Sequence, residues 1–334
     1  MVTRSAIISR LRESRDRGTR HLLEQQRDDG CFGNPETDGA GPYYKSLWAL
    51  TAAGEPEAAN RLANWIAANL LTEEGDLAGP LRGALFDRAY PYLNAWIIAG
   101  AQKLGRFDIS RRGVEFLLLM QHAEDGGFRT MRDNEESVQD IQCSAQSGNA
   151  LLLAGRLDEA RNVARFLRTL WQAQPDPENT LYFIYKPGAG LRTEFPDERQ
   201  RLHSIQYGGR RQAYFNMGIA AAFLAKMTLA TGDREWVDLA KNYLTLAFRF
   251  GDEMYETAQV GKVGWGAALV YGVTGDERYR ELAERVGEAM LNQQTGAGGW
   301  DNTGGWVNQA IRTEVTAEFI VIFDEMIAGL AMRE

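Results

Sequence analysis

Asp140 is the first residue that could do chemistry, because it stands where a long polar segment enters an apolar one. A carboxyl group that is buried in such a place has a raised pKa, which suits a general acid or base. Cys143 follows within one helical turn and could line the wall of a pocket. The same spacing also fits an aspartate that caps a helix and a cysteine that packs in the core, so both interpretations stay open.

Three further residues are candidates for a catalytic role. Asp38 and Glu256 lie in segments that precede other apolar stretches, which is the position that Asp140 occupies. His203 is the only histidine placed in a long loop, and the ordinary pKa of histidine suits proton transfer near neutral pH. A histidine that merely packs in the loop explains the same position, and this alternative stays open.

Aromatic residues at the same boundaries are candidates for binding a substrate. Tyrosines begin two of the apolar stretches, and one of them is followed by Lys45. A tyrosine has an apolar ring and a polar tip, which suits a cation-stabilising wall, a platform for a sugar, or simple packing. Residues 293–311 add two tryptophans among glycines, followed by Glu314. The predicted substrate-binding residues are Tyr44, Tyr92, Cys143, Tyr207, Arg211, Trp300 and Trp306.

The composition excludes several function classes. A net charge of −8 argues against nucleic acid or an anionic membrane as the main partner, so we expect a small-molecule substrate. Two cysteines are too few for a cysteine-rich metal site, and phosphate-loop, serine-elbow and HExxH motifs do not occur in the sequence, so we expect no metal and no cofactor. The longest apolar run, residues 217–230, contains Lys226, and the charged start lacks a signal-peptide core. These features predict a cytoplasmic protein without a membrane span.

The elements that must position these residues repeat with a period of roughly fifty residues. Five short glycine turns, which begin at Gly54, Gly105, Gly155, Gly232 and Gly275, are each followed by a charged amphipathic stretch typical of an outer helix. The predicted outer helices are residues 4–26, 56–70, 109–121, 157–171, 234–250 and 277–292. The stretches before the turns are rich in alanine and glycine, which is typical of helices that are buried all round. The predicted inner helices are residues 43–53, 90–104, 141–154, 212–231, 257–274 and 312–332.

This alternation predicts an all-α fold, a toroid or (α/α)6 barrel of about six helical hairpins, with residues 1–334 as a single domain. The long links from outer to inner helices then lie on one face, where ligand-binding residues are expected. The link of residues 172–211 is long enough to be a lid or a pocket wall. Because every inner helix begins at this face, the positive helix ends favour an anionic or electron-rich ligand.

Three of the links carry a repeated motif that begins with Gln26, Gln121 and Gln294 and ends in glycine and an aromatic residue. This motif resembles the QxxDGGF/W repeat of the terpenoid cyclase and protein prenyltransferase toroid superfamily. The resemblance implies the toroid, and the chemistry does not carry over. An Asp-x-Asp-Asp tetrapeptide is not found in this sequence, and the last histidine and cysteine, His203 and Cys143, lie too early for the zinc ligands of a prenyltransferase.

The leading functional hypothesis is therefore an enzyme that uses carboxylate acid–base catalysis on a hydrophobic, isoprenoid-like molecule in an aromatic-lined cavity. The reaction would be a cyclisation, an isomerisation or an elimination. The first alternative is a carbohydrate-active lyase or glycosidase of the (α/α)6 type, for which two facing pocket carboxylates would speak. The second alternative is a toroid that binds a ligand or partner without catalysis.

Overall fold

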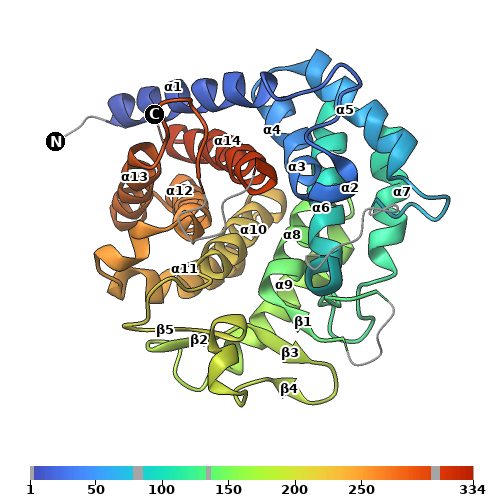
Figure 1. Ribbon diagram of the computed structural model, residues 1–334. Coiled ribbons are helices and arrows are strands. Elements are labelled where there is room, and N and C mark those ends of the chain that lie inside the picture. Colours follow the sequence, from blue (N-terminus) through green and yellow to red (C-terminus); the bar gives the residue numbers. More distant parts are fainter. Residues whose placement is uncertain (1–3, 78–85, 133–136, 302–308, 334) are drawn as a thin grey trace.

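Twelve main helical segments of the computed structural model form two concentric rings, and the structure describes residues 4–77, 86–132, 137–301 and 309–333 (Figure 1). The outer helices are α1 (Arg4–Leu23), α5 (Pro56–Asn69), α7 (Phe107–Leu118), α9 (Leu157–Gln172), α11 (Arg234–Leu244) and α13 (Glu277–Asn292). The inner helices are α4 (Ser46–Ala52), α6 (Phe86–Leu104), α8 (Ile141–Leu153), α10 (Phe215–Thr231), α12 (Gly261–Thr274) and α14 (Gln309–Ala331). The predicted all-α toroid is confirmed.

The two kinds of helix differ in burial as their sequences predict. The outer helix α9 buries one apolar face that includes Val163, Phe166 and Leu170, while its charged residues face solvent. The inner helix α12 is buried from Gly261 to Gly272. None of the described helices is long and apolar enough to cross a membrane.

Small residues let the inner helices touch backbone to backbone. A Cβ atom added at Gly218 of α10 would lie 1.9 Å from the carbonyl oxygen of Lys262 in α12. No side chain fits into such a gap, so only glycine permits this approach. The contact fixes the start of α12, which holds a charged residue of the central pocket described below.

Each turn that contains the repeated glutamine motif connects one outer helix to the next outer helix. In all three copies the glutamine side-chain amide donates to a glycine carbonyl of its own turn and to a backbone carbonyl of the next outer helix. For Gln26 the acceptors are Gly30 and Ala58, at 3.1 and 2.9 Å. For Gln294 the outer helix is α1, so this copy joins the end of the ring to its beginning (Figure 1).

A fourth copy of this turn has no glutamine. Thr72 donates its backbone N–H to Asp76, and Gly75 donates to Thr72, as the corresponding residues do in the other three turns. Gly75 has φ +93°, and a Cβ atom there would lie 2.2 Å from the carbonyl oxygen of Arg112 in α7. The turn therefore forms without the glutamine but keeps the glycine, which lies against the next outer helix.

Several boundaries differ from the predicted ones. The first inner helix is broken at Lys45 into α3 (Gly41–Tyr44) and α4, and residues 258–260 form a single 3-10 turn, η4 (Ala258–Val260), before α12. Helix α11 ends at Leu244 and continues as the 3-10 helix η2 (Thr245–Arg249). A further short helix, α2 (Pro35–Asp38), lies in the first link, and η3 (Asp252–Glu256) lies in the fifth.

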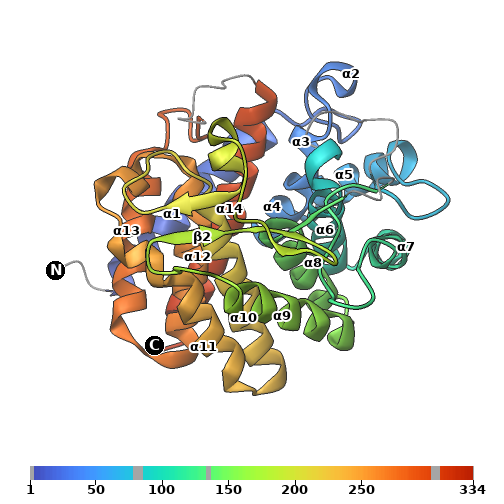
Figure 2. The same cartoon turned by 90° about the horizontal axis from the view of Figure 1, so that it is seen from below.

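The long link after α9 contains strands that the sequence pattern did not predict. Strand β2 (Thr180–Tyr182) pairs antiparallel with β5 (Ser204–Gln206), and β3 (Ile184–Lys186) pairs with both β1 (Gln139–Asp140) and β4 (Gly190–Leu191). The 3-10 helix η1 (Asp197–Leu202) precedes β5. Figure 2 shows these strands together on one side of the helical barrel. Strands of two or three residues carry too little periodicity to be recognised from sequence.

Candidate functional site

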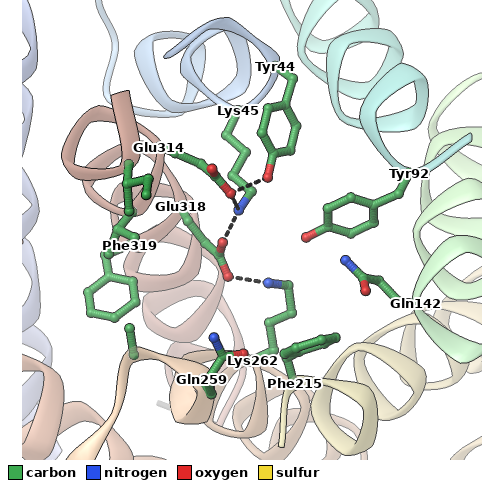
Figure 3. Close-up of a pocket in the computed structure, with 13 residues that line it drawn as sticks. Tyr44, Lys45, Tyr92, Gln142, Phe215, Gln259, Lys262, Glu314, Glu318 and Phe319 are labelled. Carbon is green, nitrogen blue, oxygen red and sulfur yellow. Dashed lines mark hydrogen bonds and ion pairs between the residues drawn. The ribbon is translucent and has the colours of Figure 1, made fainter. Parts of the chain in front are cut away.

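A pocket of about 380 Å³ opens at the centre of the barrel, where the N-terminal parts of the inner helices converge. Every inner segment contributes at least one side chain, and Figure 3 shows these side chains arranged around a common space. The lining residues are Tyr44, Lys45, Tyr92, Gln142, Phe215, Ala258, Gln259, Lys262, Ile311, Glu314, Val315, Glu318 and Phe319.

One wall of the pocket is a chain of ion pairs. Lys45 donates to the carboxylates of Glu314, at 2.9 Å, and Glu318. The other oxygen of Glu318 accepts from Lys262. Tyr44 donates its hydroxyl proton to the same oxygen of Glu314 that Lys45 contacts (Figure 3). Two carboxylates and two ammonium groups from three helical segments are therefore linked into one network.

The network fixes the charge of its members. Burial disfavours the charged form of Lys45, but Glu314 and Glu318 raise the pKa of Lys45 well above its usual value. Burial opposes ionisation of Glu318, but Lys262 and Lys45 lower the pKa of this carboxyl to about 2. Burial, reinforced by Glu314, raises the pKa of Tyr44 well above that of a free phenol. Near neutral pH the network therefore holds charged Lys45 and Glu318 beside a protonated Tyr44.

Aromatic rings lie close to the ammonium groups of the two lysines. The Nζ atoms of Lys45 and Lys262 lie 5.7 and 5.9 Å from the ring centre of Trp96, and each lies 6.0 Å from that of Tyr92. Cation–π attraction at this range holds the ammonium groups in place. Trp96 in turn packs against Trp48 and Trp265, and these three buried rings close the floor.

A second ion cluster lies deeper along the same helices. Glu325 of α14 pairs with Lys226 at 2.7 Å and accepts from the indole N–H of Trp265. Burial lowers the pKa of Lys226, with Glu325 opposing the shift. Lys103 stands in the last turn of α6, where the negative helix end favours a cation, and Lys226 lies one turn before the last turn of α10. This cluster has a structural explanation, and the tryptophans separate it from the pocket.

Several polar groups around the pocket have donors left for a ligand. Lys262 donates one of its three N–H groups to Glu318. The hydroxyl of Tyr92 and the amide of Gln142 point into the open space, and Gln259 lies beside Lys262 (Figure 3). The pocket thus offers hydrogen-bonding groups on several sides and the Phe215 and Phe319 rings between them.

Two of the predicted site residues, Tyr44 and Tyr92, line this pocket. Asp140 and Cys143 stand next to it without lining it. Asp140 is the N-cap of α8, where its carboxylate accepts from the backbone N–H of Cys143 at 2.6 Å. Burial raises the pKa of Asp140 to about 6, as the sequence-based argument expected. The catalytic role of Asp140 stays a prediction, and its capping role is observed.

The other predicted residues lie away from the pocket. His203 is buried in the long link, stacked on Phe195 with ring centres 4.6 Å apart. Tyr207 is half exposed under Arg249, and Trp300 is a core residue that donates to Met290.

Three charged candidates make surface contacts. Asp38 accepts from the backbone of Asn34, Glu256 pairs with the exposed Arg210, and Arg211 is exposed with φ +53°. Trp306 lies outside the described residues. Proposed roles for these residues would need a ligand that reaches beyond the central pocket.

Lys262 and Glu318 are the residues that sequence reasoning missed. Lys262 is a single charge within the otherwise apolar stretch of α12, whereas Glu318 is one of several charged residues in α14. A charge that is buried all round needs a partner, so the isolated lysine on an inner helix was a usable signal. Lys45 and Glu314 were noted beside the tyrosine and tryptophan candidates but were not assigned a role.

No protein-family model and no curated protein matches this sequence. Solved structures do match. A D-mannose isomerase superposes with a TM-score of 0.69 at 14% identity, covering 93% of this chain and 96% of that one. A sugar epimerase from a ruminal bacterium gives 0.64 at 14% identity, covering 95% and 98%. An α-1,6-mannanase of Salegentibacter sp., as an inactive variant with two adjacent aspartates changed to asparagine, gives 0.60 at 11% identity, covering 96% and 99%. These likenesses show the fold.

The structures named above share the helical toroid with this chain, and they give no support to a terpenoid cyclase in particular. The aspartate pair of the mannanase has no counterpart among the described residues of the pocket. The only adjacent aspartates in this chain, Asp28 and Asp29, are exposed in the turn after α1.

Proposed function

We propose that the chain is a carbohydrate enzyme that moves a proton beside a sugar carbonyl, as an aldose–ketose isomerase or an epimerase does. The observation that carries this proposal is the ion network in a central pocket of about 380 Å³, a volume suited to one or two sugar units. The likeness to a D-mannose isomerase and a sugar epimerase supports the same substrate class. The proposal joins the substrate of the first alternative to a reaction type of the leading hypothesis.

The lining of the pocket argues against a hydrophobic isoprenoid. Four ionisable groups, Lys45, Lys262, Glu314 and Glu318, form one wall, and two glutamines add amides. Placing hydrocarbon against these groups would remove their remaining hydration and return no hydrogen bonds. Sugar hydroxyls would replace the lost water contacts, and the aromatic rings would cover the apolar faces of the sugar.

The charge states favour proton transfer at carbon over hydrolysis of a glycosidic bond. A glycosidase needs one carboxyl group that is protonated near neutral pH in order to donate to the leaving oxygen. Glu318 is held ionised by the two lysines, and Glu314 accepts hydrogen bonds from Lys45 and Tyr44. Asp140, whose raised pKa would suit such an acid, does not line the pocket.

Glu314 is the residue best placed to act as the base. Its side chain is 21% exposed, more than any other member of the network, and its hydrogen bonds hold one carboxylate oxygen in a fixed position. Glu314 removes the proton from the carbon beside the carbonyl. The electron pair of the C–H bond forms a carbon–carbon double bond, and the π pair of the carbonyl group moves onto its oxygen. Lys262 and the hydroxyl of Tyr92 donate hydrogen bonds to the resulting enediolate. Return of the proton to the former carbonyl carbon, with the hydroxyl proton passing from one enediolate oxygen to the other, gives isomerisation. Protonation of the original carbon on its opposite face, by a second donor or after the intermediate has turned over, gives epimerisation.

Deuterium exchange tests this function without knowledge of the product. The purified protein is incubated in D2O with a panel of aldoses and ketoses, and proton NMR follows loss of the signal at the carbon beside the carbonyl. We expect enzyme-dependent exchange with at least one monosaccharide or disaccharide. If no sugar in the panel exchanges its carbon-bound proton faster with the protein than in a protein-free control, the proposed function is wrong.

A further inference from the structure

The two lysines of the pocket are less exposed than its two glutamates. The side chains of Lys45 and Lys262 are 3% and 4% exposed, whereas those of Glu318 and Glu314 are 13% and 21% exposed. The ammonium groups of both lysines lie near the ring of Trp96, and both donate to the carboxylate of Glu318, which extends between them (Figure 3). The carboxylates are therefore the more exposed charges of the pocket, and each ammonium group that a ligand reaches is already paired with a carboxylate.

The formal charges of the lining cancel. Among the described residues that line the pocket, Lys45 and Lys262 are the cations and Glu314 and Glu318 are the anions. At the rim, Arg312 pairs with Asp301 at 2.7 Å, so this arginine also carries its own counter-charge. Glu314 and Glu318 lie in the second and third turns of α14, beyond its first turn, which holds no acidic residue.

We propose that Glu318 is a specificity-determining residue, which neutralises both lysines and so makes the pocket select uncharged sugars over uronates and sugar phosphates. This inference rests on the proposed function and names its substrate class. An anionic sugar would bring its charge close to Glu314 and Glu318, while the lysines among the described lining residues are already paired with these carboxylates. Like charges at contact distance in a partly buried site repel strongly.

Matched sugar pairs separate this inference from the function itself. Binding of D-mannose and D-mannuronate, and of D-glucose and D-glucuronate, is measured by titration NMR at constant ionic strength, because salt screens such interactions. We expect the wild-type protein to bind the neutral member of a pair at least about tenfold more tightly than the acid. Each pair differs at one carbon, so the ratio isolates the effect of the charge.

Substitutions of Glu318 and Lys262 are expected to shift the ratio of the two affinities, for the neutral sugar and for the uronate, in opposite directions. Glu318→Gln leaves a net positive pocket and is expected to improve the relative binding of the uronate by about tenfold. Lys262→Gln leaves a net negative pocket and is expected to strengthen the preference for the neutral sugar. The double variant Glu318→Gln with Lys262→Gln restores neutrality and is expected to return the wild-type preference. Glu235→Gln, on the exposed surface of α11, is the control and should leave the ratio unchanged.

The outcomes are distinguishable. If the wild-type protein binds sugars but takes the uronate as well as or better than the neutral partner, this inference is overturned and the proposed function stands. If neither member of either pair binds and deuterium exchange is also absent, both are overturned. Should Glu318→Gln not fold, the wild-type ratio and the Lys262→Gln ratio still decide the question.

Discussion

Lys45 and Glu318 are 273 residues apart in the sequence, yet their side chains form an ion pair that joins the first inner segment of the barrel to the last. Lys45 sits at the break between α3 and α4, and Glu318 lies in α14. The Gln294 turn closes the outer ring in the same place by bonding to α1. The pocket is thus built across the seam of the toroid, and the Lys45–Glu318 pair belongs both to the site and to the closure of the inner ring.

Removing Glu318 should cost much stability. Glu318→Ala leaves two buried ammonium groups, on Lys45 and Lys262, without their shared partner, and breaking a buried pair in this way typically costs about 3–5 kcal/mol. Denaturant unfolding measures the change. Glu235→Ala removes an exposed partner of Arg168 and should cost no more than about 1 kcal/mol. Equal losses in the two variants would contradict a buried network.

The lowered pKa of the Glu318 carboxyl predicts that the protein loses folding stability in acid. The folded-state pKa of Glu318 is lowered to about 2 from the ordinary glutamate value of 4.5, so its stabilising effect is full above the unfolded-state pKa. This effect is lost as the pH falls from about 4.5 towards 2. In a variant that folds, Glu318→Gln should therefore show a flatter loss of stability across this window than the wild-type protein. A slope unchanged by the substitution would argue that other groups control acid unfolding.

The raised pKa of Asp140 predicts that its contribution to folding stability depends on pH with the opposite sign. Its folded-state pKa is raised by burial to about 6, so the folded protein binds a proton more tightly than the unfolded chain does. Its contribution is most favourable at low pH and declines as the pH rises from about 4 to 6, by about 3 kcal/mol in total. Asp140→Asn keeps a cap for α8 and should remove this decline. If Asp140→Asn abolishes sugar exchange while the fold is intact, the residue is catalytic after all.

The contact between α10 and α12 makes a sharp prediction for glycine substitutions. Gly218→Ala places a methyl group 1.9 Å from the carbonyl oxygen of Lys262, so the two helices must separate and the pocket wall must move. We expect a lower melting temperature and weaker ligand binding. Gly296 is exposed, and a methyl group added there would meet no atom within 4 Å, so Gly296→Ala is the matched control and should be nearly neutral. Tolerance of both substitutions would contradict the backbone contact.

The fold was predictable because its signals are local and repeated. Glycines such as Gly105 and Gly155 end one helix and start the next, and the change from charged to alanine-rich stretches separates the two rings. The strands around Leu181 and Ile205 were not predictable, because their pairing joins residues far apart in the chain. The Gly75 turn lacked its glutamine, so it was not recognised as a copy of the motif.

The site was only partly predictable. Tyr44 and Tyr92 were found because tyrosines at the open ends of inner helices must point either into the barrel mouth or into the core. Lys262 and Glu318 were missed because the sequence does not show which way a charged side chain on an inner helix points. Which way it points depends on the rotation of each helix, and contacts such as Gly218 against Lys262 set that rotation. Trp300 looked like a rim residue, yet its ring fills the core beside Phe319.

The most direct test compares deuterium exchange into a sugar by the wild-type protein and by Glu314→Gln. The substitution keeps the size of the side chain and removes its basicity, so binding should persist while the exchange rate falls by about a hundredfold or more. Tyr44→Phe, which removes only the hydrogen bond to Glu314, should reduce the rate less. Exchange by the wild-type protein that is lost in Glu314→Gln would support the account. Exchange that is equally fast in Glu314→Gln would contradict it.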